Sequence, residues 1–332
     1  MKRNVLKRVL APALCALMVV GLSACGNNGV ATSKDPVPAS KAFNTKTIWY
    51  EFSNEGVVDK DEKIRAVLSF DGNGKVTVYQ CNDLAFSGLK DLNDEDVVKL
   101  AKKQDKALFD KEKKDALDRY QEEIDSAKES HDKYQKEYDN KTYDTLYNSM
   151  DSGHFKNHPE ATQEWYKKEL SPLKLKIDFY TAMKDKLNSI KYKEPEAVKF
   201  TLSGKTDKTG NMLMEETLSF TKYSYFKHAT AFLNALDFSD LPEGLKAEST
   251  TADDLMQKLE EEGKQQTADF SWDMLAFNKQ TDSTELYPDP GVQTVYEMHF
   301  RGFGDFVMQV DEKQGGFILD AANAKEVTID EN

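Results

Sequence analysis

The chain has 332 residues and a formal net charge of −13 at pH 7. Like charges repel within a Debye length, so this acidity disfavours nucleic acids, anionic lipid headgroups and anionic wall polymers as broad partners. The length suits one large domain or two ordinary ones.

The first 25 residues predict export and attachment to a membrane. Four basic residues precede an apolar run from Val9 to Leu22, which is typical of a secretory signal. Leu22-Ser23-Ala24-Cys25 follows and resembles a bacterial lipobox. The resemblance implies that residues 1–24 are a signal peptide and that Cys25 is the lipidation site, carrying at least two acyl chains such as palmitate. The protein would then be lipid-anchored at the cell membrane, on its extracytoplasmic face. An ordinary signal peptide with a chance cysteine is the alternative.

Removal of the signal would change both the charge and the cysteine content. Four basic residues leave, which takes the net charge from −13 to −17, and Cys15 leaves with them. Only Cys81 then remains besides Cys25, so no intramolecular disulfide is available and stability must come from burial. No other apolar run approaches the roughly 20 residues of a membrane span.

The next segment predicts a flexible tether over residues 25–45. It is rich in Gly, Asn, Ser and Pro, a composition typical of linkers, and would hold a folded body of residues 46–332 off the membrane. Ile48, Tyr50 and Phe52 alternate with their neighbours, as in a strand with one buried face.

A β-hairpin is predicted next. Residues 64–70 and 76–78 alternate in polarity, and Asp71-Gly72-Asn73-Gly74 between them supplies residues that tolerate positive φ. The same four residues resemble the start of a calcium loop. The oxygen ligands that such a loop needs at later alternate positions are missing, so the turn is preferred.

Residues 94–192 predict a helical insertion. Asn93 is a plausible N-cap with Asp96 three residues later, and an apolar stripe ends near Phe109. A heptad-like seam follows, formed by Leu117, Tyr120, Ile124, Ala127, His131, Tyr134 and Tyr138. After a break at residues 153–159, Ser171-Pro172 suits either a helix start or a kink, and residues 173–190 carry a second stripe of the same period. The two stripes predict a long antiparallel helical hairpin of roughly 50 Å.

Tyrosines on the first stripe make it a candidate binding surface. Tyr120, Tyr134 and Tyr138 favour partial exposure and would receive another protein of the cell envelope. The alternative is that their rings pack against the partner helix while the hydroxyls reach water.

The remainder of the chain predicts short strands and two helices. A second hairpin joins residues 198–202 to residues 213–220, and further strands are expected at 270–277, 292–300, 306–310, 316–319 and 327–329. Helices are expected over residues 226–236 and 251–263. Strands at both ends of a helical block predict an α+β fold: a mostly antiparallel β-sheet body with the hairpin inserted. Regular strand–helix alternation is missing, which disfavours a doubly wound solute-binding protein.

No motif predicts catalytic residues, a metal site or a cofactor. His154 and His158 are four residues apart, but Gly153 and Pro159 flank them and no third ligand is fixed by spacing. Neither the G-x-S-x-G elbow nor the H-E-x-x-H motif is present. Cys81 suits a small core residue better than a nucleophile.

The order of parts also resembles uncharacterised cell-surface lipoproteins of low-GC Gram-positive bacteria. The resemblance lies in the lipobox, Thr47-Ile48-Trp49-Tyr50, Gly74-Lys75-Val76-Thr77 and the Lys-rich helical segment, and it implies a location but no activity. The sequence therefore predicts a membrane-anchored, non-enzymatic binding or interaction protein. The alternatives are an envelope- or wall-acting enzyme with a non-local active site and a small-molecule-binding lipoprotein.

Overall fold

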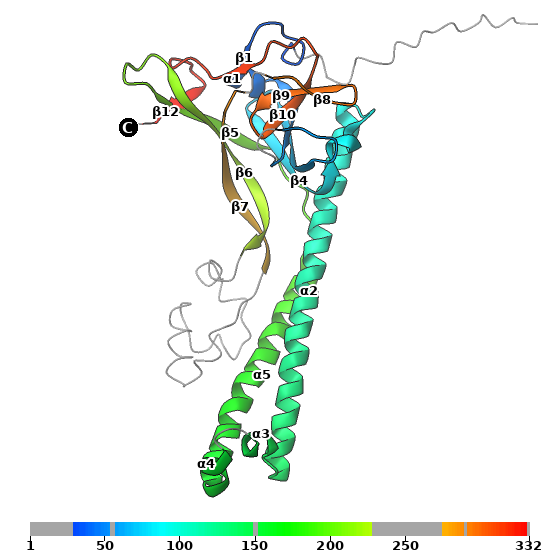
Figure 1. Cartoon of the computed structure of the whole chain (residues 1–332), viewed down its shortest axis with the longest axis vertical. Helices are drawn as coiled ribbons and strands as arrows, with labels where there is room; N and C mark the ends of the chain where they lie inside the picture. The colour runs from blue at the N-terminus through cyan, green and yellow to red at the C-terminus, as the bar shows by residue number, and fades with distance from the viewer. Residues whose placement is uncertain (1–28, 54–56, 149–151, 228–273, 289–290, 331–332) are drawn as a thin grey trace, which may run out of the picture.

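A computed structural model describes residues 29–53, 57–148, 152–227, 274–288 and 291–330 (Figure 1). The chain folds as an α+β protein with a mostly antiparallel sheet, which confirms the predicted class. The strands of the main sheet are β2 (Lys46–Glu51), β3 (Lys63–Asp71), β4 (Lys75–Ala85), β5 (Val198–Thr206), β6 (Leu213–Lys227), β7 (Met274–Glu285), β8 (Gln293–Val295), β9 (Met298–Phe303), β10 (Phe306–Val310) and β12 (Val327–Ile329). Two short strands, β1 (Val37–Pro38) and β11 (Phe317–Ile318), pair in parallel beside it.

The order in the main sheet is β7-β6-β5-β4-β3-β2-β10-β9-β8, and β12 pairs in parallel with β5. The predicted hairpin of residues 64–78 is confirmed as β3 and β4. Gly72 and Gly74 in its turn both have φ of +77°, a conformation that favours glycine. β6 and β7 form a long two-stranded ribbon that leaves the body on the side of the helices (Figure 1).

Both faces of the central strands are buried, because each face is covered by a different part of the chain. One face packs against α1 (Ala39–Phe43) and against residues 30–37 and 317–324. Trp49 is fully buried on this face, with its ring 5.0 Å from that of Phe306. The other face, which includes Tyr50, packs against the 3₁₀ helix η1 (Phe86–Leu89) and the start of the first long helix. The expectation of a single buried face on residues 47–52 was therefore wrong.

The predicted tether is also wrong from residue 29 onward. Val30, Ala31 and Val37 are each 1% exposed, and α1 lies in the core. The polar composition of this segment did not indicate order because its partners, residues 311–317, come near the other end of the sequence. The predicted signal peptide and Cys25 lie outside the described residues.

The helical insertion starts as predicted and then differs. Helix α2 (Asp94–Asn140) begins at the Asn93 cap, whose side chain accepts a hydrogen bond from the Asp96 amide at 3.0 Å. It continues past Phe109 without a break. Two short helices follow, α3 (Asp144–Tyr147) and α4 (Ser152–Asn157), and then α5 (Pro159–Ser189).

Helix α5 passes through Ser171-Pro172, so a helix start at that point was wrong. Tyr166 before the proline and Tyr180 after it are both buried, and this packing on each side offsets the backbone hydrogen bond that proline lacks.

Several predicted elements fall partly or wholly outside the described residues. These are the helix at 251–263, most of the helix at 226–236 and the first residues of the strand at 270–277. Among the residues that the structure describes, no helix is both long and apolar enough to cross a membrane.

Candidate interaction site

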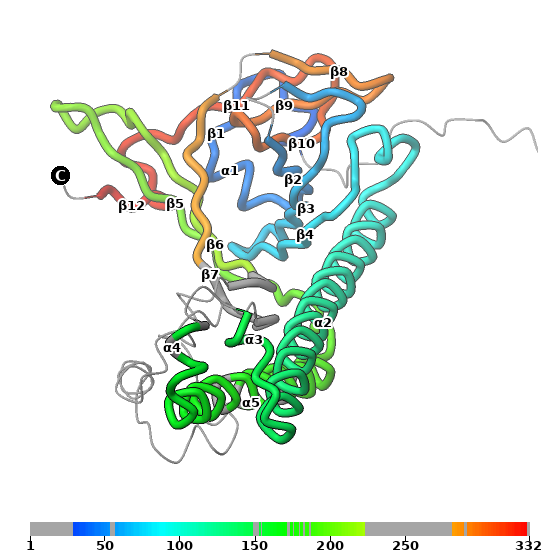
Figure 2. Tube along the Cα trace, turned by 60° about the horizontal axis from the view of Figure 1, so that its bottom comes forward, coloured from blue at the N-terminus to red at the C-terminus, as the bar shows by residue number. Residues whose placement is uncertain are grey.

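Helices α2 and α5 lie against each other in opposite directions (Figures 1 and 2). Lys113, in the first half of α2, donates to the carbonyl oxygens of Asn188 and Ile190 at the end of α5, at 3.0 and 2.6 Å. Further along α2, Tyr134 lies 5.5 Å from the ring of Trp165 near the start of α5. A lysine at the C-terminal carbonyls of a helix stabilises that end, so Lys113 helps to fix where α5 stops.

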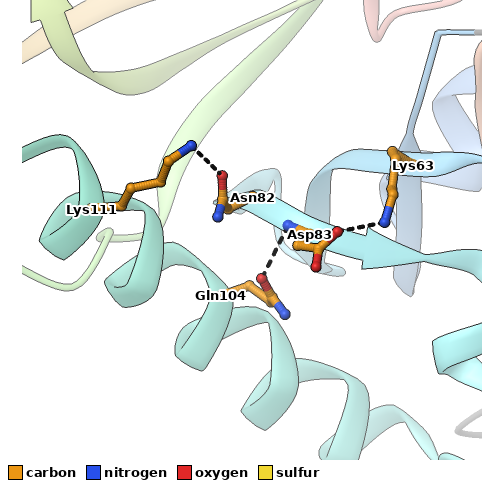
Figure 3. Close-up of polar contacts among 5 residues, drawn as sticks. All are labelled: Lys63, Asn82, Asp83, Gln104 and Lys111. Atoms are coloured by element: carbon orange, nitrogen blue, oxygen red, sulfur yellow. Dashed lines mark hydrogen bonds and ion pairs between the residues drawn. The ribbon is translucent and has the colours of Figure 1, made fainter. Parts of the chain in front are cut away.

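Polar contacts join the base of α2 to the end of β4 (Figure 3). Gln104 accepts from the Asp83 amide at 3.3 Å, Lys111 donates to Asn82 at 3.5 Å, and Lys63 pairs with Asp83. These groups are exposed, and exposed pairs contribute little to stability.

A buried carboxylate makes a stronger connection at the same place. Asp105 of α2 is fully buried, and it accepts from the Gln80 amide of β4 and the Tyr192 hydroxyl, both at 2.8 Å. Burial, followed by the hydrogen bond to Asp105, raises the pKa of Tyr192, so this hydroxyl remains a donor. A buried acceptor that lost its donors would be costly, so Asp105 holds α2 in one orientation on the sheet.

The structure separates the three tyrosines that the sequence suggested for binding. Tyr120 is 2% exposed and its ring lies 5.7 Å from that of Tyr180, inside the contact between α2 and α5. Its predicted role in binding was therefore wrong, because the partner helix covers it. Tyr134 and Tyr138 are only half-buried.

Tyr134 and Tyr138 belong to a group of mostly aromatic side chains at the far end of the helices. We call this group the distal aromatic cluster; its members are Tyr134, Tyr138, Tyr143, Leu146, Tyr147, Phe155, Trp165 and Tyr166. Tyr143, Leu146 and Tyr166 are buried, whereas the other five are half-buried and reach the surface. Aromatic side chains with one buried and one exposed part are typical of protein-binding surfaces.

Glu137 organises the cluster from within. Its carboxylate accepts hydrogen bonds from the Thr145 amide and hydroxyl, each at 2.9 Å, and from the Tyr166 hydroxyl. Burial alone would raise the pKa of Glu137, but the hydrogen bonds from Tyr166 and Thr145 outweigh burial and the pKa is lowered. Glu137 is therefore an anion at neutral pH, and it fixes α3 against both long helices.

The turn between α2 and α3 is strained. Lys141 and Tyr143 have φ of +57° and +54°, the left-handed region that side chains with a Cβ rarely adopt. Such strain costs on the order of 1–3 kcal/mol per residue and persists only where the surroundings enforce it. Here the burial of the Tyr143 ring against Tyr166, at 5.4 Å, enforces it.

Sequence reasoning missed Glu137, Tyr143 and the Trp165-Tyr166 pair. Glu137 is one of many charges on α2, and nothing in its local sequence separates it from a solvated surface residue. The available signal was the density of aromatic residues around the predicted break, with Tyr143 and Tyr147 before it and Trp165-Tyr166 after it.

Two further residues singled out from the sequence are Cys81 and His158. Burial, followed by the charge of Asp105, raises the pKa of Cys81 to about 12, so its thiol is protonated at neutral pH. His158 is exposed just before α5. Within the described ranges, no three His, Cys, Asp or Glu side chains come together in a way that could hold a metal ion.

A separate cleft lies between the sheet and the first turns of α2. It has a volume of about 330 Å³ and Ile48 and Val98 as apolar lining; its charged residues have both signs, namely Lys46, Lys99, Lys102, Asp94 and Glu95. Lys99 and Lys102 form ion pairs with Asp96 and Glu194, outside the set of lining residues.

Comparison with known proteins adds no assignment: the chain matches no protein family, no curated protein and no solved structure.

Proposed function

We propose that this protein is a lipid-anchored binding protein of the cell envelope, without enzymatic activity, that is attached through Cys25 and contacts an envelope protein through the distal aromatic cluster. In this proposal α2 and α5 act as one antiparallel helical hairpin that presents the cluster. The N-terminal lipobox-like sequence supports the location, on the extracytoplasmic face of the cell membrane.

The observation that carries the binding role is the arrangement of the cluster. Half-buried aromatic side chains surround a buried carboxylate that accepts three hydrogen bonds, so the surface is held in one shape before any partner arrives. A preorganised aromatic surface loses less entropy on binding than a flexible one, which favours affinity.

Site-specific photocrosslinking on intact cells tests the proposal. A photoreactive amino acid replaces Tyr147 in the cluster. A matched variant carries it at Glu129, an exposed position on α2 about three turns before the end of that helix and outside the cluster. We expect one envelope protein to be captured from position 147 and not from position 129. Capture of the same protein equally from both positions, or from neither, would remove the cluster from the binding role.

A second pair of variants separates binding from folding. Trp165→Ala removes a half-buried ring of the cluster, and Lys128→Ala removes an exposed side chain elsewhere on α2. We expect Trp165→Ala to reduce partner capture at least tenfold, the equivalent of about 1.4 kcal/mol. Circular dichroism at 222 nm should show helix content close to that of the unaltered protein in both variants.

The cleft beside α2 favours a second candidate, a small-molecule-binding lipoprotein. Its volume of about 330 Å³ lies at the lower end of the range of ligand sites, and its apolar lining by Ile48 and Val98 would favour a small apolar molecule. Anilinonaphthalene sulfonate is a probe of that chemistry. If Val98→Trp, which fills the cleft, leaves the binding of this probe unchanged, the second candidate fails.

A further inference from the structure

The described chain is held firmly from its first residues. The Val30 carbonyl accepts from the Gln314 side chain at 3.4 Å, the Ala31 carbonyl from the Asp311 amide at 2.9 Å, and the Ser33 carbonyl from the Gly315 amide at 2.8 Å. We call this the N-terminal clamp: residues 30–37 held by residues 311–317. Val30 and Ala31 are buried by it, so the clamp continues the core and is not a loose contact.

Gly315 shows how close the two backbones are in the clamp. A Cβ atom at this position would lie 2.2 Å from the Lys34 carbonyl oxygen and 2.7 Å from its carbonyl carbon. Because the obstacle is backbone, no side-chain rotation relieves it. The clamp therefore depends on glycine at position 315.

The clamp leaves very little free chain after Cys25. Val30 is the fifth residue after Cys25, and five residues span at most about 17 Å when fully extended. Helix α2, with 47 residues, is about 70 Å long. The reach of the anchor is thus a small fraction of the length of the helical hairpin.

The clamp and the distal aromatic cluster lie at opposite ends of the molecule. Figure 1 shows β1 and α1 at one end of the molecule and α3 and α4 at the other, where the long helices end. A short anchor at the β1 end brings that end to the membrane and leaves the other end free.

We propose that the end of the body formed by the N-terminal clamp rests on the lipid bilayer, and that the helical hairpin extends away from it. The distal aromatic cluster would then meet a partner located well outside the membrane surface, not one embedded in it. The inference rests on the proposed lipidation of Cys25 and adds the orientation of the protein and the position of its partner.

The charges at the clamp are consistent with a surface held by the lipid rather than by electrostatic attraction. Its exposed charged residues are Lys34, Asp35, Asp311, Glu312 and Lys313, which sum to a net negative charge. Such a surface has no excess of basic residues to bind anionic headgroups. The short covalent attachment is what keeps it at the bilayer.

Energy transfer to labelled lipid tests the orientation. The lipidated full chain, in a Cys81→Ala background, receives a donor dye at Lys313→Cys in the clamp or at Asn157→Cys in α4, both exposed positions. It is bound to phosphatidylcholine vesicles that contain an acceptor-labelled lipid. We expect strong donor quenching at position 313 and weak quenching at position 157. A second pair, Lys34→Cys and Asp139→Cys, repeats the comparison should either first variant fail to fold.

A longer tether is the matched control. Insertion of roughly 20 Gly and Ser residues between Asn28 and Gly29 adds a coil with an average span of about 25 Å. Quenching at position 313 should then fall markedly. Quenching that is equally strong at positions 313 and 157 would overturn the orientation and leave the anchor intact. Failure of the lipidated chain to float with the vesicles would overturn the anchor itself.

Discussion

Two carboxyl groups, those of Glu216 and Asp320, meet inside the body. Glu216 of β6 is fully buried, Asp320 is nearly so, and the Glu216 carboxyl accepts from the Asp320 amide at 2.8 Å. Asp320 in turn accepts from the Ser40 amide and hydroxyl, at 2.7 and 2.6 Å. Burial, together with the Asp320 carboxyl, raises the pKa of Glu216 from 4.5 to about 8, so Glu216 carries a proton at neutral pH.

This protonation makes stability depend on pH in a defined direction. The folded state keeps the proton on Glu216 up to a higher pH than the unfolded chain does, so its contribution to stability is full below pH 4.5. The contribution is lost as the pH rises towards about 8. We expect Glu216→Gln to lose this dependence and to gain, relative to the unaltered protein, roughly 4 kcal/mol between pH 5 and pH 9. Urea unfolding of both proteins at pH 5 and pH 9 measures this difference in the free energy of unfolding. Identical pH profiles for the two proteins would contradict the raised pKa of Glu216.

Strain at the end of α2 leads to a second prediction at this scale. Lys141 is exposed and has φ of +57°, which glycine adopts without cost. Lys141→Gly should therefore stabilise the protein by about 0.5–1 kcal/mol. Asn140→Gly, one residue earlier and still in the helix, should destabilise it by about 0.3 kcal/mol. The melting temperatures of the two variants, compared with that of the unaltered protein, test this prediction. A loss of stability in both variants would show that the turn is not strained.

Among the elements, the contact between α2 and α5 depends on its buried rings. Tyr120 and Tyr180 pack on each other at 5.7 Å, and both are almost fully buried. Tyr120→Ala should cost about 3–5 kcal/mol, the range for removing a buried aromatic side chain. Tyr138→Ala, at a half-buried position of the same helix, should cost clearly less. Urea unfolding followed by circular dichroism at 222 nm measures the stability of both variants. Equal losses of stability would contradict the difference in burial between Tyr120 and Tyr138.

Local signals were sufficient where an element is decided by its own residues. The β3–β4 hairpin was predictable because Gly72 and Gly74 make a tight turn between alternating strands. The start of α2 was predictable because the Asn93 side chain caps it. The unbroken length of α2 was less evident, because its apolar stripe ends near Phe109 and charged residues with good helix propensity continue the helix to Asn140.

Distant partners explain the rest of the differences. The segment 29–45 is ordered by residues 311–320, and no property of its own sequence indicates such a partner. The candidate site has the same limit: Tyr120 and Tyr134 occupy equivalent positions on one stripe, and only the arrangement of α3, α4 and α5 makes one buried and the other half-buried.

At the scale of the whole molecule, Gly315→Ala tests how much stability the contact between residues 30–37 and residues 311–317 contributes. The added methyl would meet the Lys34 backbone at 2.2 Å, so residues 30–37 must separate from residues 311–317. We expect a loss of roughly 2–4 kcal/mol in stability. We also expect faster amide hydrogen exchange at Val37, whose amide donates to the Gly316 carbonyl at 3.0 Å. Gly210→Ala, in an open turn with φ of +71°, should cost less and leave exchange at Val37 unchanged.

The clamp also has a consequence for the order in which the chain can fold. Residues 30–37 find their place only on residues 311–317, and β12 near the other end of the sequence pairs with β5. Contacts that join distant parts of a chain form late, because the intervening loop must close first. The body therefore cannot finish folding while the chain is still being made or threaded through a membrane. If the protein is exported as its first residues suggest, the clamp and the pairing of β12 can form only after residues 311–329 have crossed the membrane.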